Sequence, residues 1–354
     1  MKAIIGNRFG ETLDEIQANF DTFTTILNGI GRTNMTVSRN SNKFLPSLLK
    51  PGNTIYVEFE DGTPPWGGIL DLPFVWGVDG VKIACYEIAK RFKTRVTDKL
   101  ASFYGFQAGT IFRLILTREE NQSPMGLVMG SIWEGGDPHY PSFHHTSIWD
   151  VLDYSIRAME RCDFRFVPYL DDGYIKFRAD FFQIAGEDKT NSVMFSEGRN
   201  IGAITDIEER GDIINVHYAI GDGTVWDETR TVIIVEDKDS IASYGRGETA
   251  ASYSGTTMEA LLTMQGRNVI RLNSQPRVIF RAPVTNNEPG KYSTYDLGDT
   301  IKCYLPSYGF DGFYDSVRIM ARDYNANNGA CELVLEVQNE PEYWIYQEEL
   351  TEGA

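Results

Sequence analysis

Cysteine is scarce in this sequence, and its placement argues against a disulfide-stabilised fold. The four cysteines, Cys85, Cys162, Cys303 and Cys331, lie far apart, and no two of them form a CxxC pair. Three of them fall inside apolar, strand-like runs, where a free thiol packs as a small hydrophobe. We therefore expect no disulfide framework, which fits assembly in a reducing cytoplasm.

Basic residues are also few. The chain has 33 Lys and Arg against 50 Asp and Glu, which gives a net charge of −17. Wrapping DNA or docking on anionic lipid needs clustered Lys and Arg, so the composition argues against both. The acidic charge either keeps the protein soluble or lines a passage through which a polyanion slides without sticking. No apolar run approaches the roughly 18 residues of a membrane span, and the N-terminus lacks a secretory apolar core.

Motifs for catalysis are missing as well. The sequence has neither the G-x-x-x-x-G-K-[ST] loop of nucleotide-binding enzymes nor the G-x-S-x-G turn of hydrolases. The chain has 50 acidic residues, so two carboxylates can lie close together by chance, and such a pair is little evidence for glycoside hydrolysis. His217, in the run INVHYAI, is typical of a strand residue. We therefore expect a protein that is not an enzyme and that uses no cofactor.

A histidine-rich loop is the local pattern that most suggests a metal site. His139, His144 and His145 lie close together in WEGGDPHYPSFHH, which also contains Glu134 and Asp137. Zinc ligands normally project from rigid elements supported by further hydrogen bonds. This Gly- and Pro-rich loop either folds around a metal or exposes its histidines, so the three histidines are weak metal candidates.

A heptad-like seam near the N-terminus predicts a helix. Its apolar residues recur at 4-3-4-3-4 spacing: Phe9, Leu13, Ile16, Phe20, Phe23 and Leu27. Thr12 and Glu15 fit a capping box, and Gly29 with Gly31 ends the pattern. We expect this helix to pack on its own domain or on a neighbour, with a trimeric coiled coil as the alternative.

Helical spacing returns in the middle of the chain. It occurs over 86–116 and, most regularly, over 146–159 in TSIWDVLDYSIRAM. Ser147 is the expected N-cap of the second helix, with Asp150 at its third position. Both helices belong to a mixed region between runs of strands.

A short helix is also expected at 256–266, followed much later by an irregular tail. Thr256 and Glu259 form the helix's capping box, and Gly266 is its expected stop. The last 16 residues, NEPEYWIYQEELTEGA, are acidic and aromatic and have no period. We expect them to become ordered only against a partner.

The rest of the chain alternates with period two, and aromatics reach 12% of the residues, so strands dominate the prediction. A hairpin is expected around the turn Asp171-Asp172-Gly173. The expected strands cover 54–60, 67–72, 79–87, 163–170, 173–182, 200–209, 212–221, 230–237 and 277–284.

Two distant segments look alike. PGNTIYVEF at 51–59 and LGDTIKCYL at 297–305 share their turn chemistry and alternation. We align Ile69 with Ile319; fourteen residues after each lies the centre of a further strand. A β-unit therefore occurs twice in this chain. Three such chains around an axis place six similar units in a ring, which lets a threefold object dock on a sixfold tube.

The sequence resembles the trimeric baseplate-hub and tail-tip proteins of tailed phages and related injection systems. That family includes the N-terminal hub part of tail-associated lysins and prophage minor tail proteins. The resemblance covers about 50–340 and is carried by PGNTI (51–55), SIWDVL (147–152) before DFRFVP, SEGRNI (196–201), GDIINVHYAIGDG (211–223), SIASYGRGE (240–248) and LGDTI (297–301). The N-terminal heptad pattern departs from the family. The absence of a peptidase or fibre module before residue 354 implies a hub-only version.

The resemblance implies a β-rich α+β fold with two tube-like β-barrel domains and inserted mixed α/β accessory domains. The expected boundaries are 1–33 for an N-terminal helix or arm, 34–85 for the first part of the first tube-like domain, 86–165 for the inserted accessory domain, 166–195 for a hairpin completing the first β-domain, 196–340 for the second tube-like domain with an insertion at about 237–275, and 341–354 for the acidic tail.

The same resemblance implies a structural virion protein, a homotrimeric hub at the distal end of a phage tail tube. It would adapt the sixfold tube to threefold tip components and let DNA pass during ejection without binding it specifically. The implied partners are a hexameric distal tail or tube protein, the C-terminus of the tape-measure protein, and a central fibre or spike. The implied location is the tail tip of a virion that is assembled in the host cytoplasm.

Aromatic residues in Gly- and Pro-rich loops are either sugar platforms or contact anchors. Our interface candidates are Trp66, Trp76, Trp133 and Trp344, together with the N-terminal seam Phe9, Leu13, Ile16, Phe20, Phe23 and Leu27. One rival function is a carbohydrate-binding or depolymerising receptor-recognition protein of the tail tip, with two carboxylates about 5–10 Å apart in an aromatic groove. Another is a monomeric adaptor of the same assembly.

Overall fold

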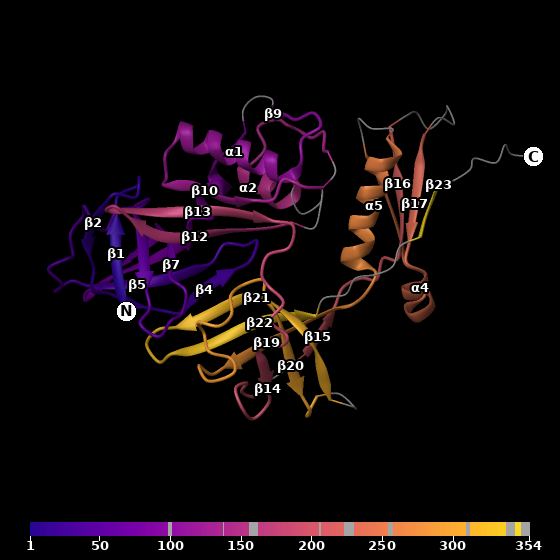
Figure 1. The fold of residues 1–354 in the computed structure, drawn as a ribbon. Coiled ribbons are helices and arrows are strands. Elements are labelled where there is room, and N and C mark those ends of the chain that lie inside the picture. Colours follow the sequence, from indigo (N-terminus) through magenta and orange to yellow (C-terminus); the bar gives the residue numbers. More distant parts are fainter. Residues whose placement is uncertain are drawn as a thin grey trace, which may run out of the picture. The chain divides into compact units, whose positions relative to one another are not determined.

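The structure, a computed structural model, describes residues 1–97, 101–136, 138–155, 162–204, 207–222, 230–253, 258–308, 312–337 and 344–347. The chain forms two compact units: the first comprises 1–156, 162–206 and 280–336, and the second comprises 157–161, 207–279 and 337–354. Both consist mainly of strands with few helices, which confirms the β-rich class (Figure 1). No described helix is both long enough and apolar enough to cross a bilayer.

The first unit begins with a seven-stranded antiparallel sheet in the order β2-β1-β6-β7-β8-β5-β3. Its strands are β1 (Lys2–Gly6), β2 (Thr12–Glu15), β3 (Asn19–Phe20), β5 (Arg32–Ser38), β6 (Thr54–Glu58), β7 (Trp66–Trp76) and β8 (Gly80–Glu87). The strands predicted at 67–72 and 79–87 are present as β7 and β8, which pair antiparallel. Ile55, Leu70 and Ile83 have no accessible surface. Burial alternates along β8, as the period-two signal of the sequence predicts.

The predicted N-terminal helix is wrong. Residues 9–27 instead contribute β2, β3 and β4 (Phe23–Ile26). The apolar residues of the seam lie in short strands and in the turns between them. The Phe23 ring lies 5.2 Å from the Phe20 ring and 5.6 Å from the Trp66 ring, measured between centroids. The hydroxyl of Thr12 donates to the carbonyl of Gly173 rather than capping a helix. Packing of the aromatic residues therefore overrides the helical period.

The middle of the first unit mixes short helices with a three-stranded sheet. Its elements are the 3₁₀ helix Ile88–Thr94, β9 (Ala101–Ser102), α1 (Ala108–Gln122), β10 (Leu127–Ile132), β11 (Ser142–Phe143), α2 (Ile148–Asp150) with a following π turn at Val151–Ser155, β12 (Asp163–Asp171) and β13 (Tyr174–Phe182). The Ser147 side chain accepts from the Asp150 amide, so this predicted cap is confirmed. The rest of that predicted helix, 156–159, lies outside the described residues.

The β12–β13 hairpin forms as predicted, with Asp172 and Gly173 at positive φ in its turn. The hairpin forms a three-stranded sheet with β10, in the order β10-β13-β12. Backbone contacts also connect it to the N-terminal segment: the Thr12 amide donates to the Gly173 carbonyl, the Ile175 amide donates to the Gly10 carbonyl, and Glu11 forms an isolated bridge with Tyr174. That the hairpin completes the first β-domain stays a prediction.

A second sheet in the first unit contains β14 (Met194–Ser196), β20 (Thr300–Leu305), β21 (Phe313–Asn325), β22 (Ala330–Val337) and β19 (Arg277–Val284), in the order β14-β20-β21-β22-β19. The N-terminal strand β4 pairs antiparallel with β21, so one segment connects the start of the chain to this sheet. Phe195, Cys303 and Leu333 are fully buried in it. All four cysteines are buried, and none of them forms a disulfide. Among the described residues, neither large sheet closes on itself.

The second unit is a four-stranded sheet covered by a helix (Figure 1). Its elements are β15 (Ile207–Arg210), β16 (Val216–Ile220), β17 (Val232–Glu236), α4 (Lys238–Tyr244), β18 (Glu248–Ser252), α5 (Glu259–Asn273) and β23 (Trp344–Gln347), with the sheet order β18-β16-β17-β23. A small core joins the helix to the sheet through Leu262 and Ile270 on α5 and Ala219, Ile233 and Val235 on the strands.

Two predictions for this unit need correction. Gly266 does not end its helix, because α5 continues to Asn273. A Cβ at Gly266 would lie 2.5 Å from the Val235 side chain, so the glycine lets the helix approach the sheet.

The C-terminal tail is not wholly irregular either, because β23 pairs antiparallel with β17. An edge strand offers unpaired backbone groups to any extended segment. The expected cap Thr256 lies outside the described residues.

The predicted repeat is confirmed in its strand order, since β6-β7-β8 and β20-β21-β22 are neighbours in the same sequence. The turns that open the two repeats also match. The amide of Gly52 donates to the Leu70 carbonyl, and the Leu70 amide donates to Asn53; Gly298, Ile319 and Asp299 repeat this pair of bonds. Ile319 therefore corresponds to Leu70, one residue from the predicted partner Ile69.

The two turn glycines form a matched pair for mutation. Gly52 and Gly298 have φ values of 88° and 91°, a region that costs other residues about 1–2 kcal/mol. A Cβ at Gly52 meets no atom within 4 Å, whereas one at Gly298 lies 2.7 Å from the Ala185 carbonyl oxygen. We predict that Gly298→Ala destabilises the protein by about 1–3 kcal/mol more than Gly52→Ala, because of the added overlap. Urea denaturation of both variants measures this difference, and equal losses would contradict it.

Candidate functional site

A buried ion pair joins three segments of the first unit. Asp163 opens β12, and its carboxylate pairs with the guanidinium of Arg318 on β21. The same carboxylate accepts from the Asn28 side-chain amide at 2.6 Å and from the Ala185 backbone amide at 2.8 Å. Asn28 follows β4 and accepts in turn from the Phe164 amide at 2.7 Å. The N-terminal segment, the hairpin and the second sheet therefore meet at one carboxylate.

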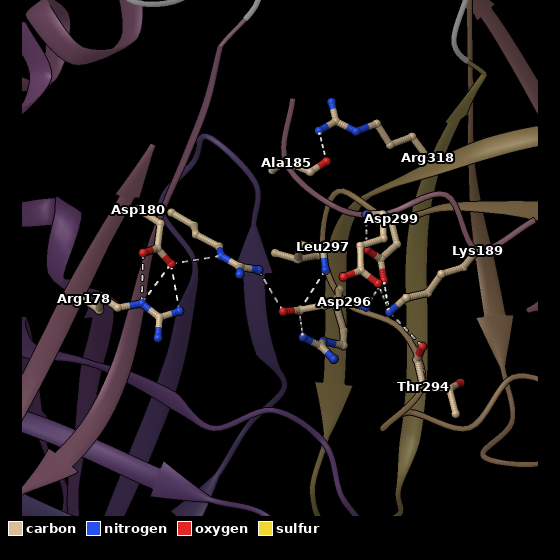
Figure 2. A network of polar contacts seen from close by, with 12 residues as sticks. Arg178, Asp180, Ala185, Lys189, Thr294, Asp296, Leu297, Asp299 and Arg318 are labelled. Atoms are coloured by element: carbon tan, nitrogen blue, oxygen red, sulfur yellow. Dashed lines mark hydrogen bonds and ion pairs between the residues drawn. The ribbon is translucent and has the colours of Figure 1, made fainter. Parts of the chain in front are cut away.

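Arg318 also donates to two backbone carbonyls. Its Nε donates to Gly298 at 3.0 Å. Its Nη2 donates to Ala185 at 2.8 Å (Figure 2). The residue is only 3% exposed. Gly298 belongs to the turn that opens the second repeat, so the guanidinium also holds that turn. A buried charge is tolerated when it is paired and its donors are satisfied in this way.

Further charged pairs extend from this centre. Asp180 on β13 accepts from Arg178 at 2.9 Å and lies 3.6 Å from the Arg165 guanidinium. Lys189 pairs with Asp299 at 2.8 Å and donates to the Thr294 carbonyl (Figure 2). Together these pairs form a polar network along the boundary between the hairpin and the second repeat. Pairs with exposed members contribute little stability, so the buried Asp163–Arg318 pair dominates.

Exposed apolar side chains gather at the free end of the β7–β8 hairpin. Leu72, Val75, Trp76 and Val78 are 63%, 57%, 62% and 86% exposed. The Trp76 ring lies 5.8 Å from the Phe44 ring and 6.4 Å from the Phe74 ring, measured between centroids. Exposed apolar residues gathered on one hairpin are candidates for an interaction surface. We call Leu72, Val75, Trp76 and Val78 the hairpin patch.

Some of the other predicted contact residues are exposed, and some are buried in the core. Phe9 and Leu13 are exposed, and Trp133 is partly buried. The core of the first unit contains Ile16, Phe20, Phe23, Leu27 and Trp66, each at most 3% exposed. These five have no surface to offer a neighbour, since the chain itself covers them. Trp344 lies in β23, and its side chain is outside the described residues.

The three histidines do not converge. His139 is buried and its backbone pairs with Phe106, whereas His144 and His145 are exposed and their rings lie 4.7 Å apart. Among the residues that the structure describes, no three His, Cys, Asp or Glu side chains are placed to hold a metal. Asp137, from the same loop, lies outside those residues.

Sequence reasoning missed the junction residues Asn28, Asp163 and Arg318. The sequence held one weak signal for a buried charge: Asp163 borders an apolar strand, and Arg318 interrupts another between Val317 and Ile319. Their pairing joins positions 155 residues apart, and no local pattern links them.

Comparisons with known proteins show what this fold resembles. No family model and no curated protein matches the sequence. Among solved structures, prophage tail protein gp18 from Listeria monocytogenes is similar over 96% of each chain, at 12% identity and a TM-score of 0.60. The 43 kDa tail protein of prophage MuSo2 from Shewanella oneidensis matches over 96% of this chain and 98% of its own, at 10% identity and a TM-score of 0.60.

A third similar structure comes from a secretion system. The E. coli type VI secretion component, described as structurally similar to the T4 bacteriophage tail proteins gp27 and gp5, matches over 92% of this chain and 75% of its own, at 10% identity and a TM-score of 0.54. At such identities the likeness concerns the fold. The chain has the fold of phage tail proteins, and the resemblance predicted from the sequence is confirmed at that level.

Removing the buried carboxylate tests the junction. We predict that Asp163→Ala destabilises the protein by about 3–5 kcal/mol, because it leaves Arg318 as an unpaired buried charge. Asp171→Ala is the matched control at the other end of β12. Asp171 pairs with Lys176 at the surface, and losing such a pair costs about 1 kcal/mol at most. Chemical denaturation measures both losses, and a similar small loss for the two variants would contradict the assigned role.

Proposed function

We propose that this protein is a structural subunit of a phage-type tail tip that forms a trimeric hub at the end of the tail tube. The observation that carries the proposal is the repeated strand opening, with matching hydrogen bonds at Gly52 and Gly298. Two like β-units per chain become six in a trimer, the number that a sixfold tube presents. The tail-protein fold of the solved relatives supports the same role.

In this proposal each repeat belongs to a tube-like domain. The first includes the strands before residue 85 with the hairpin in 166–195, and the second covers 196–340 with an insertion at about 237–275. The accessory region 86–165 lies outside the tube. Sheets that do not close within one chain leave edge strands, such as β14, and pairing between neighbouring subunits would satisfy them. Two barrels closed in this way are part of the proposal.

The charge and the hairpin patch have separate roles in the proposed hub. A net charge of −17 disfavours adhesion of DNA to the protein, so DNA crosses the lumen during ejection without being held. The hairpin patch is the proposed apolar contact with a neighbouring subunit of the trimer. Its aromatic member, Trp76, is of the residue type that most often anchors protein interfaces. The tape-measure C-terminus and a fibre or spike are the other proposed partners.

The native mass tests the trimer. We predict a particle of three times the 40.0 kDa chain mass by native mass spectrometry at micromolar concentration. A double variant, Trp76→Ser with Val78→Ser, should shift that particle towards monomer while leaving the monomer folded by circular dichroism, because truncating buried aromatic anchors weakens association.

The control for this variant is Tyr104→Ser. Tyr104 is 74% exposed and lies outside the hairpin patch, so its loss should leave the trimer intact. A wild-type protein that stays monomeric, alone and with its tube partner, contradicts the hub. A trimer that survives the double variant contradicts the role of the hairpin patch and leaves the hub in place.

A further inference from the structure

A small cavity of about 70 Å³ lies in the first unit, where β4, β7, β12 and β21 approach one another. Most of its wall is apolar and includes Ile26, Pro64, Pro65, Trp66, Phe166 and Pro168. Four charged or titratable side chains also line it: Glu87, Arg165, Asp296 and Arg322. An apolar pocket with a few converging polar groups is the usual form of a small-molecule site.

Arg322 has an unused donor at this cavity. Its side chain is only 6% exposed, and its Nη2 contacts Asp296 at 3.3 Å. Its Nη1 is buried and has no hydrogen-bond partner among the described residues. Asp296 cannot serve it fully, because the other carboxylate oxygen accepts from Arg165 at 2.9 Å. An unsatisfied buried donor is costly, so a ligand acceptor at this position gains a strong, charge-assisted bond.

Glu87 and Asp296 are the two acidic side chains of the cavity wall. The Glu87 Oε2 accepts from the Gly31 amide, and burial raises the pKa of its carboxyl to about 8, although the Arg322 charge opposes this shift. The Asp296 carboxylate is shared by the guanidinium groups of Arg165 and Arg322, and Arg165 also lies 3.6 Å from Asp180, outside the cavity wall. A ligand carboxylate therefore finds its charged partner in Arg322.

We propose that this cavity binds a small organic carboxylate, whose oxygens accept from Arg322 Nη1 and whose short apolar body lies against the proline and aromatic wall. The geometry favours a carboxylate over phosphate or sulfate. Those ions carry oxygens on every side and lose water from all of them on burial, whereas most of the cavity wall is apolar. The proposal is independent of the hub assignment.

Propionate is the probe for this site. Titration of the full-length protein with ¹³C-carboxyl propionate at pH 6.5 and constant ionic strength should give a saturable NMR shift. Arg322→Gln removes the donor, and Ile26→Trp fills the cavity from a strand position that is 38% exposed. Each should weaken binding at least tenfold. Ile184→Trp, at an exposed position outside the cavity wall, should bind like the wild type. Melting curves verify that each variant is folded.

The pH dependence gives a second readout. Raising the pH from 6.5 to 9 ionises Glu87 beside the ligand, so propionate affinity should fall in the wild type and fall less in Glu87→Gln. A capped glutamate amide, tested alongside, separates the two sources of carboxylate: tighter binding of propionate indicates a free acid, and tighter binding of the glutamate indicates a protein side chain. No saturable propionate binding, unchanged binding in Ile26→Trp, or equal affinity for phosphate would overturn the proposal.

Discussion

The Asp163 carboxylate is the point on which the first unit depends. It pairs with Arg318 and accepts from Asn28 and Ala185, so it connects the N-terminal segment, the β12–β13 hairpin and the second repeat. Within the described residues that hairpin is a member of neither large sheet, and an isolated bridge between Glu11 and Tyr174 links it to the N-terminal segment. Because both charges are buried, any arrangement that separates them leaves an uncompensated charge in the interior. The ion pair therefore favours one arrangement of these segments over others that would pack equally well by apolar contact alone.

Local patterns were sufficient to predict much of the fold. Alternation of residue types identified β6, β7, β8, β12 and β13. In β8 and the first half of β13 it matches one buried and one more exposed face, whereas in β6 four consecutive residues are buried. The Ser147 cap and the Asp172-Gly173 turn depend only on neighbouring residues, and both were correct. The repeat was also visible, since the same turn chemistry opens both copies.

Long-range packing explains the errors. The seam from Phe9 to Leu27 has helical spacing, yet it contains short strands, in which Phe23 packs against Trp66 and β4 pairs with β21. Gly266 looked like a helix stop because its role, close approach to Val235, depends on a strand far away in sequence. Five of the interface candidates, Trp66 among them, were wrong for the same reason, because they are core residues. The Asp163–Arg318 pair and the unused Arg322 donor arise from contacts that no local motif encodes.

The proposed hub rests on the two β-units occupying equivalent places around one axis. Cryo-electron microscopy of the purified assembly tests this most directly. We predict a ring with threefold symmetry around an open lumen. In this ring the sheets containing β6-β7-β8 and β20-β21-β22, six in all, alternate at the same radius. A particle without threefold symmetry, or a threefold ring in which the two sheets lie at different radii, would contradict it.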